Sequence, residues 1–404
     1  MVVTDHPSPQ TPQTIREFGA ANPKMRTRDQ ADALGISEAQ LVAASCGAGA
    51  TRVDPHPDRV MEAAQKLGEV MALTRNPSCV HEKIGRYDNY HPGKHAAMIL
   101  TPEIDLRIFP AHWCHAFMVE TGVDGGTRRS LQVFDAAGDA VHKIFLRAGA
   151  SLCAWDALRL SGALPDQAQT LDVAPRQPAE APKSNPDKAG PLREEWRRMT
   201  DTHQFLRLVS KMKMNRLGAY RIAGAPFVRA LDPGAVDAML SRLAESGIAV
   251  MIFVGNRGCI QIHSGPVETL RPMGPWQNVM DPGFNLHLRR DRIAEVWAVE
   301  KQTRDGPTTS VEAFDADGGL ILQVFGLRKE TGDHRAAFAD MVAELPGVSA
   351  SEGQGLKQAR SKGSYINANV AFDYFYTRIN RGEIPDEDQQ AAPNTLVRRF
   401  VSTP

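Results

Sequence analysis

The chain has 404 residues, 42% of them hydrophobic and 23% charged, which is typical of a globular protein with room for two or three domains. Lys and Arg total 47, as do Asp and Glu, and this zero net charge argues against nucleic-acid binding and polybasic membrane anchoring. The sequence has no apolar run long enough to span a membrane, no signal-peptide pattern and no CxxC pair among its five cysteines. We therefore expect a cytoplasmic protein without membrane insertion, a disulfide framework or a four-cysteine zinc site.

The N-terminal part begins with a polar, proline-rich stretch, residues 1–15, which we expect to be a flexible tail. Residues 26–44 have apolar residues at helical spacing, interrupted by Gly35, with Ser37 as an N-cap. This pattern favours an αα-hairpin. A DNA-binding helix–turn–helix is the alternative, and the neutral charge and lack of a basic recognition helix argue against it.

Two arms of similar length, residues 16–163 and 191–347, flank a stretch rich in Pro, Ala and charge, residues 164–190, which predicts a linker. The arms repeat each other. A constant offset of 180 residues aligns the following pairs: Met71 and Met251, Asn76 and Asn256, Cys79 and Cys259, Leu106 and Leu286, Ser130 and Ser310, Phe134 and Phe314, Gly138 and Gly318. Because the register holds without a gap, we infer an internal duplication.

Each arm contains segments that alternate as β-strands do. Residues 104–109, IDLRIF, place Ile104, Leu106 and Ile108 on one face and Asp105, Arg107 and Phe109 on the other. Residues 284–289 alternate in the same way, and residues 296–301 and 314–325 add further strands, the latter with an Asp-Gly-Gly turn.

Helical patterns occur at residues 58–67 and 235–246, in matching places of the two arms, and at residues 192–214 after the linker. Short turns between successive strands favour antiparallel pairing. The sequence thus predicts an α+β fold built by tandem duplication, in which each repeat is a large antiparallel sheet flanked by helices.

Histidines are the main candidates for chemistry, since GxSxG, P-loop and HExxH motifs are missing. In the helical segment 192–214, His203 falls on the same stripe as Trp196, Met199 and Leu206. Such an imidazole is either a hydrogen-bonded core residue or an axial ligand to the metal of a planar, apolar cofactor. A second group is spaced closely enough for transition-metal binding, although exposed loop residues are the alternative: His91, His95, His112, Cys114 and His115.

The two-copy layout, DTHQF around His203, EIDLRIF in the first arm and LQVFGLR in the second resemble the cytoplasmic hemin-degrading and heme-trafficking proteins of bacterial heme-uptake operons. The resemblance extends from about Arg16 to about Gly347. It implies one heme b (iron protoporphyrin IX) in a cleft between the halves, with His203 as the iron ligand and Arg107 and Phe109 over the distal face. It also implies propionate contacts from Arg216, Lys301, Gln323 and Arg328, and places Phe325 where the family usually has a tyrosine.

The strand and helix patterns constrain these implied roles. Arg107 shares a face with Phe109, which suits stacking over a porphyrin, but also with Asp105, which allows a salt bridge instead. Lys301 shares a face with Trp297 and Val299, so its ammonium is expected to reach a carboxylate beside apolar surface.

Three further expectations concern backbone geometry. Arg328 is five residues after Gln323, so in a regular strand it points to the opposite face. A bulge at Gly326 is therefore expected to return it to the cleft face. Arg216 follows His203 by 13 residues, so the helix must end or bend near Met214. His287, the counterpart of Arg107, is either an alternative ligand or a sheet residue that packs in its own copy.

Three functions remain open on these residues. The first is oxidative opening of the porphyrin ring with iron release, where Arg107 polarises bound oxygen. The second is a chaperone that delivers imported heme to a separate heme oxygenase, and the third is a duplicated module for another anionic small molecule. The expected partners are a heme-uptake transporter, a heme oxygenase or a reductase, and a second copy in a homodimer. Residues 348–404 form a C-terminal extension to which no role is assigned.

Overall fold

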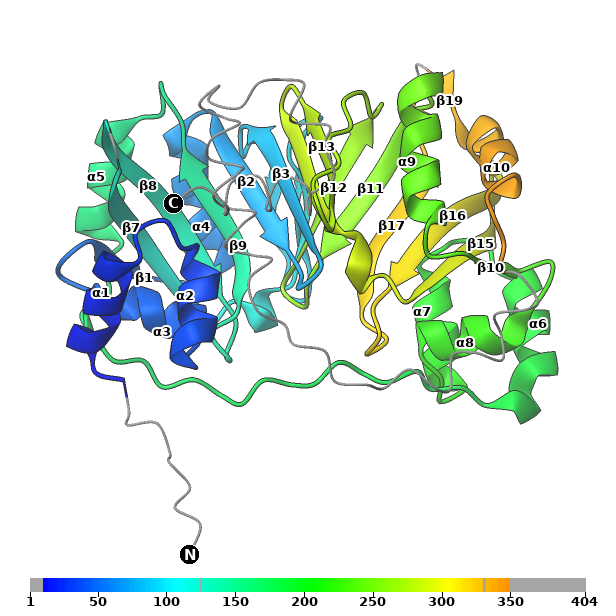
Figure 1. The fold of residues 1–404 in the computed structure, drawn as a ribbon, viewed down its shortest axis with the longest axis horizontal. Helices are drawn as coiled ribbons and strands as arrows, with labels where there is room; N and C mark the ends of the chain where they lie inside the picture. The colour runs from blue at the N-terminus through cyan, green and yellow to red at the C-terminus, as the bar shows by residue number, and fades with distance from the viewer. Residues whose placement is uncertain (1–9, 124, 330–331, 349–404) are drawn as a thin grey trace, which may run out of the picture.

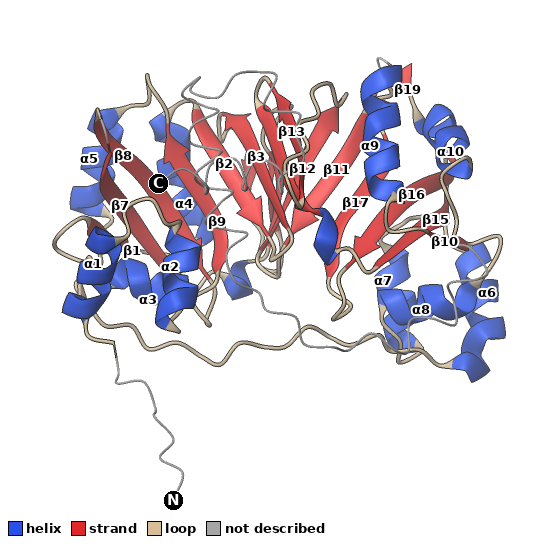
Figure 2. Cartoon of the chain, in the orientation of Figure 1, coloured by secondary structure: helices blue, strands red, loops and turns tan. Residues whose placement is uncertain are grey.

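A computed structural model describes residues 10–123, 125–329 and 332–348 of the chain. Two large antiparallel sheets stand next to each other in the middle of the molecule, and helices gather at its two ends (Figure 1; Figure 2). The predicted α+β class and tandem duplication are confirmed. The C-terminal extension, residues 348–404, lies outside the described residues except for its first member.

The first sheet has eight strands, of which six come from the first repeat and two from the second. In spatial order, the strands are β1 (Ala50–Val53), β7 (His115–Val123), β8 (Gly126–Phe134), β9 (Ala140–Leu146), β2 (Val70–Arg75), β3 (Cys79–Gly85), β14 (Phe284–Arg289) and β13 (Trp276–Asp281).

The second sheet has nine strands and mirrors the first, with six strands from the second repeat and three from the first. In spatial order, they are β10 (Val228–Leu231), β15 (Glu295–Thr303), β16 (Gly306–Phe314), β17 (Leu320–Gly326), β11 (Val250–Gly255), β12 (Cys259–Gly265), β6 (Asp105–Ile108), β5 (Ala97–Leu100) and β4 (Tyr90–His91). A small hairpin of β18 (Arg328–Lys329) and β19 (Gly332–Asp333) follows.

Each repeat thus gives an edge hairpin to the other repeat's sheet. Strand β6 pairs with β12 in the register Arg107 to Ile260, and β14 pairs with β3 in the equivalent register His287 to Val80. The buried side of each hairpin stays with its own repeat: Leu106 packs with the first repeat's core and Leu286 with the second's. The other side of β6 therefore belongs to the opposite face of the second sheet, away from the first repeat's core.

Helices cover both faces of each sheet. On the core face of the first sheet lie α4 (Pro57–Leu67) and α5 (Leu152–Ser161), and α9 (Ala235–Ser246) and α10 (Arg335–Ala343) take these places on the second sheet. The opposite faces carry α1 (Pro12–Ala21), α2 (Thr27–Leu34) and α3 (Glu38–Ala43) on the first sheet, and α6 (Ala189–Arg197), α7 (Gln204–Lys211) and α8 (Arg216–Ala223) on the second. The 3₁₀ turns are η1 (Pro110–His112), η2 (Pro186–Lys188) and η3 (Arg290–Arg292).

Two equivalent asparagines lock the repeats together where the β2–β3 and β11–β12 turns meet. The Asn76 amide donates to the carbonyl oxygens of Gly255 and Ile321, and the Asn256 amide donates to those of Arg75 and Val141. The side-chain oxygen of each asparagine accepts two backbone N–H groups of its own turn. This reciprocal set explains why the same residue stands at both positions.

The termini of the predicted repeats differ in part from expectation. Helix α1 begins at Pro12 with Thr11 as its N-cap, so the tail predicted for residues 1–15 is wrong from this point, because the cap and the proline at the first helical position favour a helix start. The αα-hairpin is confirmed: Gly35 ends α2 in the left-handed region, and Ser37 forms a capping box with Gln40. The linker 164–190 runs extended along one side until η2 (Figure 1).

Candidate functional site

The strand register of the second sheet brings predicted site residues from both repeats onto one face. Gln323 on β17 lies opposite Glu312 on β16 and Phe253 on β11, and the row continues through Ile262 to Asp105 on β6. Because paired residues in a sheet point to the same side, these side chains share a face. Helices α6 to α8 cover the β15–β16 end of this face. We call the face from Glu312 to Asp105 the second cleft, because the family resemblance implies a heme cleft there.

A buried charge network closes one end of the second cleft. Glu312 accepts hydrogen bonds from Lys301 Nζ at 2.9 Å and Arg216 Nη1 at 2.8 Å, with further bonds from Tyr220 Oη and Ser310 Oγ at 2.9 Å each. The Glu312 side chain is fully buried and that of Lys301 is 4% exposed. The structure therefore brings two of the three predicted propionate cations, Lys301 and Arg216, together, but around a carboxylate of the protein itself.

The electrostatics of this network leave one net positive charge. Burial opposes ionisation of Glu312, yet Lys301 and Arg216 outweigh it and lower the pKa of this carboxyl group. Burial lowers the pKa of Lys301, which Glu312 partly offsets, while Glu312 overcomes burial to raise the pKa of Arg216. Two cations and one carboxylate can accept a further anion at the cleft, as a propionate requires.

Sequence reasoning missed Glu312. The residue lies on the same strand face as Ser310 and Phe314, a pattern that does not mark a functional carboxylate. One signal was available: with a turn between β15 and β16, Lys301 pairs with Thr308 and Trp297 pairs with Glu312, so Lys301 and Glu312 lie on one face of the hairpin.

Arg107 reaches the second cleft from the other repeat. It lies on β6 next to β12, and its guanidinium group forms a salt bridge with Asp105, with about a third of the side chain exposed. The salt bridge that the strand pattern allowed is therefore present. Phe109 has the parity of Arg107 and is half-buried at the start of η1.

Aromatic rings give the cleft face its apolar surface. Phe325 on β17 and Phe253 on β11 meet edge to face with their ring centroids 5.4 Å apart, and both are half-buried. Gln323, two residues before Phe325, shares this face. A flat apolar ligand can stack on such a surface while its polar edge faces the charge network.

His203 is the N-cap residue of α7, and its side chain is 92% exposed. The prediction of one continuous helix over 192–214 with His203 on its apolar stripe is wrong, because the chain leaves the helix after α6 and Asp201 bonds the His203 backbone N–H. The same carboxylate lies 2.6 Å from His203 Nδ1, which turns Nε2 toward solvent. The helix also ends before Met214, as the position of Arg216 requires.

The neighbourhood of His203 connects it to the cleft. Phe205, two residues later, lies under the ammonium of Lys301, with Nζ 5.0 Å from the ring centroid. The loop before His203 also reaches the β15–β16 turn, where the N–H of Arg304 donates to the carbonyl of Thr200. An exposed imidazole at the N-terminus of α7 thus stands at the border of the second cleft.

Arg328 lies apart from the network. It is exposed, forms a salt bridge with Asp305, and follows Leu327, which is buried. The bulge expected at Gly326 is wrong, since the β16–β17 register shifts at Ala313 and Phe314 instead. Gly326 has a packing role: a Cβ there would lie 2.8 Å from Arg335 Cα and Phe338 Cβ of α10.

The other histidines occupy separate places. His91, His95 and His112 are exposed, and residues 10–123, 125–329 and 332–348 contain no group of three His, Cys, Asp or Glu side chains arranged to hold a metal ion. His287 lies in the first sheet, where Nδ1 is 2.8 Å from Asn278 Oδ1. His287 is thus a sheet residue that bonds to its own copy, as one of the two alternatives expected, although β14 also pairs with β3 of the other repeat.

The structure is a duplicated α+β protein in which two buried cations and an aromatic surface lie on one face of the second sheet, with an exposed imidazole nearby. The sequence profile described as "Haemin-degrading HemS.ChuX domain" matches residues 35–161 and again 213–345. The chain belongs to this family.

Named relatives cover most of the chain. The hemin transport protein HmuS of Yersinia pestis is 37% identical over 327 residues, 81% of this chain and 94% of the relative. The hemin transport protein HemS of Yersinia enterocolitica is 38% identical over 328 residues, with the same coverage.

Solved structures have the same fold. The heme-bound form of PhuS, a heme-binding protein from Pseudomonas aeruginosa, is 39% identical with a TM-score of 0.79, and the match covers 84% of this chain and 100% of PhuS. The heme-degrading enzyme ChuS of Escherichia coli O157:H7 is 33% identical with a TM-score of 0.74, covering 82% of this chain and 97% of ChuS. No helix among the described residues is both long and apolar enough to cross a bilayer.

Proposed function

We propose that this protein binds one heme in the second cleft and degrades it in the cytoplasm as part of iron acquisition. The observation that carries the proposal is the strand register that puts Arg107 of the first repeat on the same sheet face as Gln323 and Phe325 of the second. The relatives' functions support it, since HmuS and HemS are named hemin transport proteins and ChuS a heme-degrading enzyme.

In this proposal His203 Nε2 is the iron ligand. The Asp201 carboxylate accepts the Nδ1 proton, which selects the tautomer with a free lone pair on Nε2 and increases its basicity. Lys301 and Arg216 attract the propionates through the net charge that Glu312 leaves uncompensated. Phe325 and Phe253 contact the ring, and Gln323 offers a further polar contact from the same face, whereas Arg328, paired with Asp305 away from this face, has no contact in the proposal.

Bound heme would supply a redox-active iron and with it oxygen chemistry on the porphyrin itself. The contribution of this chain is positional and electrostatic. The guanidinium group of Arg107, which is paired with Asp105, would stabilise negative charge that develops beside bound heme. Phe109 excludes water beside it. Arg107 is the residue to which we assign the catalytic role.

A heme chaperone is the second candidate, and a specific observation favours it. The ligand histidine is 92% exposed in a short loop between α6 and α7, so another protein can approach the iron from that side. A carrier of this kind would receive heme from an uptake transporter and give it to a separate heme oxygenase.

One assay on hemin-loaded protein separates the two. Ascorbate is added under air with catalase present, and the Soret band and released iron are followed. Loss of the band with iron release in the wild type, and a slower loss in Arg107→Ala at equal hemin occupancy, supports degradation. A stable Soret band that moves to an added heme oxygenase supports the carrier and contradicts the enzyme.

A further inference from the structure

The first sheet has its own cleft on the face equivalent to the second cleft. It lies between helices α1 to α3 and strands that include β13 and β14, and has a volume of about 910 Å³. We call it the first cleft. Nine of its lining residues are Arg or Lys and four are Asp or Glu, so it is strongly basic within a chain of zero net charge.

Two guanidinium groups converge on one neutral atom of the first cleft. Arg28 Nη1 on α2 lies 3.5 Å from the carbonyl oxygen of Pro77, and Arg292 Nη1 in η3 lies 2.6 Å from the same oxygen. The nearest carboxylate to Arg28 is that of Asp32, at 3.9 Å. Like charges placed this closely repel each other unless an anion joins them.

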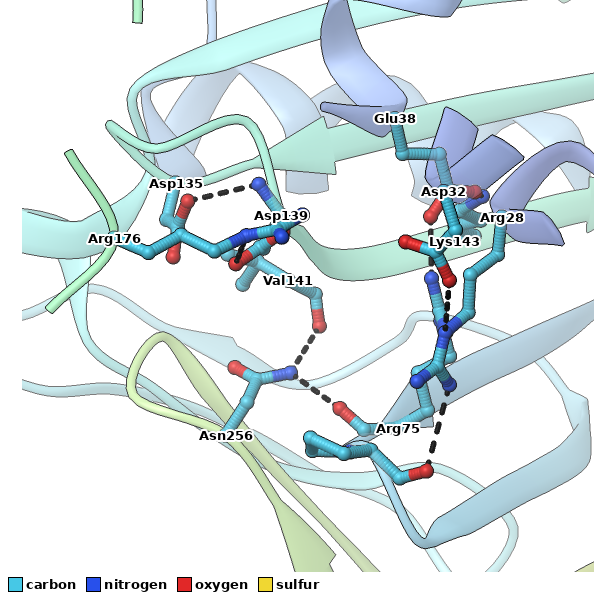
Figure 3. Close-up of polar contacts among 11 residues, drawn as sticks. Arg28, Asp32, Glu38, Arg75, Asp135, Asp139, Val141, Lys143, Arg176 and Asn256 are labelled. Atoms are coloured by element: carbon cyan, nitrogen blue, oxygen red, sulfur yellow. Dashed lines mark hydrogen bonds and ion pairs between the residues drawn. The ribbon is translucent and has the colours of Figure 1, made fainter. Parts of the chain in front are cut away.

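A third cation strengthens this repulsion. Arg75 and Lys143 both form ion pairs with Glu38, so a single carboxylate neutralises only one of the two positive charges (Figure 3). Burial first, and then the charges of Arg75 and Arg292, lower the pKa of Arg28 despite Asp32 and Glu38. Three arginines from three separate elements thus create a positive field that the described carboxylates do not balance.

The first cleft lacks the iron ligand of the second. His203 is the N-cap of the eight-residue helix α7, and the N-cap of the equivalent eight-residue helix α2 is Arg26. Residues 10–55, which include α1 to α3, contain no histidine. The histidine that does line the cleft, His287, already bonds Asn278 and lies 3.9 Å from Glu82.

We propose that the first cleft binds a small organic molecule carrying two or more adjacent phosphoryl groups. Arginine forks bind phosphate oxygens in pairs, and groups as close as Arg28 and Arg292 match phosphates that share a bridging oxygen. The volume exceeds what an inorganic anion fills and lies in the range of organic ligands. Phe145 and Trp276, which line the same cleft, offer apolar surface for the organic part.

The test uses the full-length, heme-free chain and inorganic pyrophosphate as the probe, titrated by calorimetry at constant ionic strength. We expect saturable binding of one pyrophosphate per chain, with orthophosphate binding at least roughly tenfold more weakly because it satisfies fewer of the arginines. Absence of saturable binding, or equal affinity for orthophosphate, would overturn the proposal.

Variants locate the probe. The double substitution Arg28→Gln and Arg292→Gln should weaken pyrophosphate binding roughly tenfold or more, since each removes charge-assisted hydrogen bonds. Arg59→Gln is the matched control, because Arg59 lies on α4 on the opposite face of the first sheet with 70% of its side chain exposed. Equal weakening in the control, or none in the double variant, contradicts the assignment.

A replacement variant and a measurement on hemin-saturated protein complete the test. If the double variant unfolds, Arg128→Gln replaces it, since Arg128 is an exposed lining residue whose loss leaves the core intact, and it should also weaken pyrophosphate binding. Hemin-saturated protein should bind pyrophosphate as the heme-free chain does. If hemin instead displaces pyrophosphate, the first cleft belongs to a tetrapyrrole carboxylate site and the phosphoryl assignment is wrong.

Discussion

Glu312 holds the two cations of the second cleft in place before any ligand arrives. It is fully buried between Lys301 and Arg216, and its equivalent in the first repeat is Gln132, which shows that a neutral amide fits this position of the strand. A carboxylate is therefore present for its charge rather than its shape.

Replacement of this carboxylate should destabilise the protein. Glu312→Gln leaves Lys301 and Arg216 buried without a counter-ion, so we expect the free energy of unfolding at pH 7 to fall by about 3–5 kcal/mol in urea titrations. Glu295→Gln is the control: it breaks a partly exposed pair with Arg221 and should cost about 1 kcal/mol or less. A Glu312→Gln protein as stable as the wild type would contradict this account of the network.

The family resemblance implies a tyrosine at the position of Phe325. If heme lies in the second cleft, Phe325→Tyr adds one hydroxyl donor near the propionates and should tighten hemin binding by up to roughly tenfold, the value of one hydrogen bond. Phe145→Tyr, the equivalent change in the first repeat, should leave hemin affinity unaltered. Fluorescence-quenching titrations with hemin measure both. A larger effect of Phe145→Tyr than of Phe325→Tyr would place heme in the first repeat and contradict the proposed site.

At the scale of elements, helix α3 is fixed to the first sheet by one buried carboxylate. Lys143 on β9 and Arg75 on β2 both donate to Glu38 and outweigh its burial, which lowers its pKa to about 2 from the model-compound value of 4.5. Burial also lowers the pKa of Lys143, an effect that the charge of Glu38 partly offsets.

A depressed carboxyl pKa gives stability that is present above pH 4.5 and lost as the pH falls toward 2. The shift at Glu38 corresponds to about 3 kcal/mol. We expect the urea unfolding free energy of the wild type to fall over this range, and that of Glu38→Gln to start lower and fall less. Glu245→Gln, on an exposed part of α9, should follow the wild type. Parallel curves for Glu38→Gln and the wild type would refute the argument.

The sequence predicted those features of the elements that depend only on residues close to each other in the chain. Strand parity placed Ile104 and Leu106 inside and Arg107 outside, because alternation needs only neighbouring residues. The helix break before His203 escaped the pattern, since the buried residues Trp196 and Phe205 lie on both sides of it and keep an apolar stripe in register. Local hydrogen bonds mark the break, among them those from the His203 N–H to Asp201 and from the Thr200 N–H to Gln204.

At the scale of the whole molecule, the constant offset between the repeats predicted the duplication but not the exchange of hairpins. The alternation of β6 is the same whether its edge meets β3 or β12, so no local pattern selects the partner strand. The exchange matters for function, because it carries Arg107 to the second repeat's cleft. The boundaries 16–163 and 191–347 stay predictions, since each repeat completes the other's sheet.

Because the sheets are interlaced, we expect the described core to unfold as one cooperative unit. Scanning calorimetry should give a single transition for the wild type, and Leu240→Ala, in the core of the second repeat, should lower its temperature without splitting it. The cavity left by this fully buried side chain is expected to cost about 2–5 kcal/mol. Two resolved transitions in either protein would contradict a shared unfolding unit.

The most direct test of the central claim is a hemin titration of the wild type, His203→Ala and His95→Ala, followed by the Soret band. His95 is exposed in a loop of the first repeat and serves as the control. Our account predicts one heme per chain with the same spectrum in the wild type and His95→Ala, and a weakened, shifted Soret band in His203→Ala. An unchanged band and affinity in His203→Ala would contradict His203 as the iron ligand.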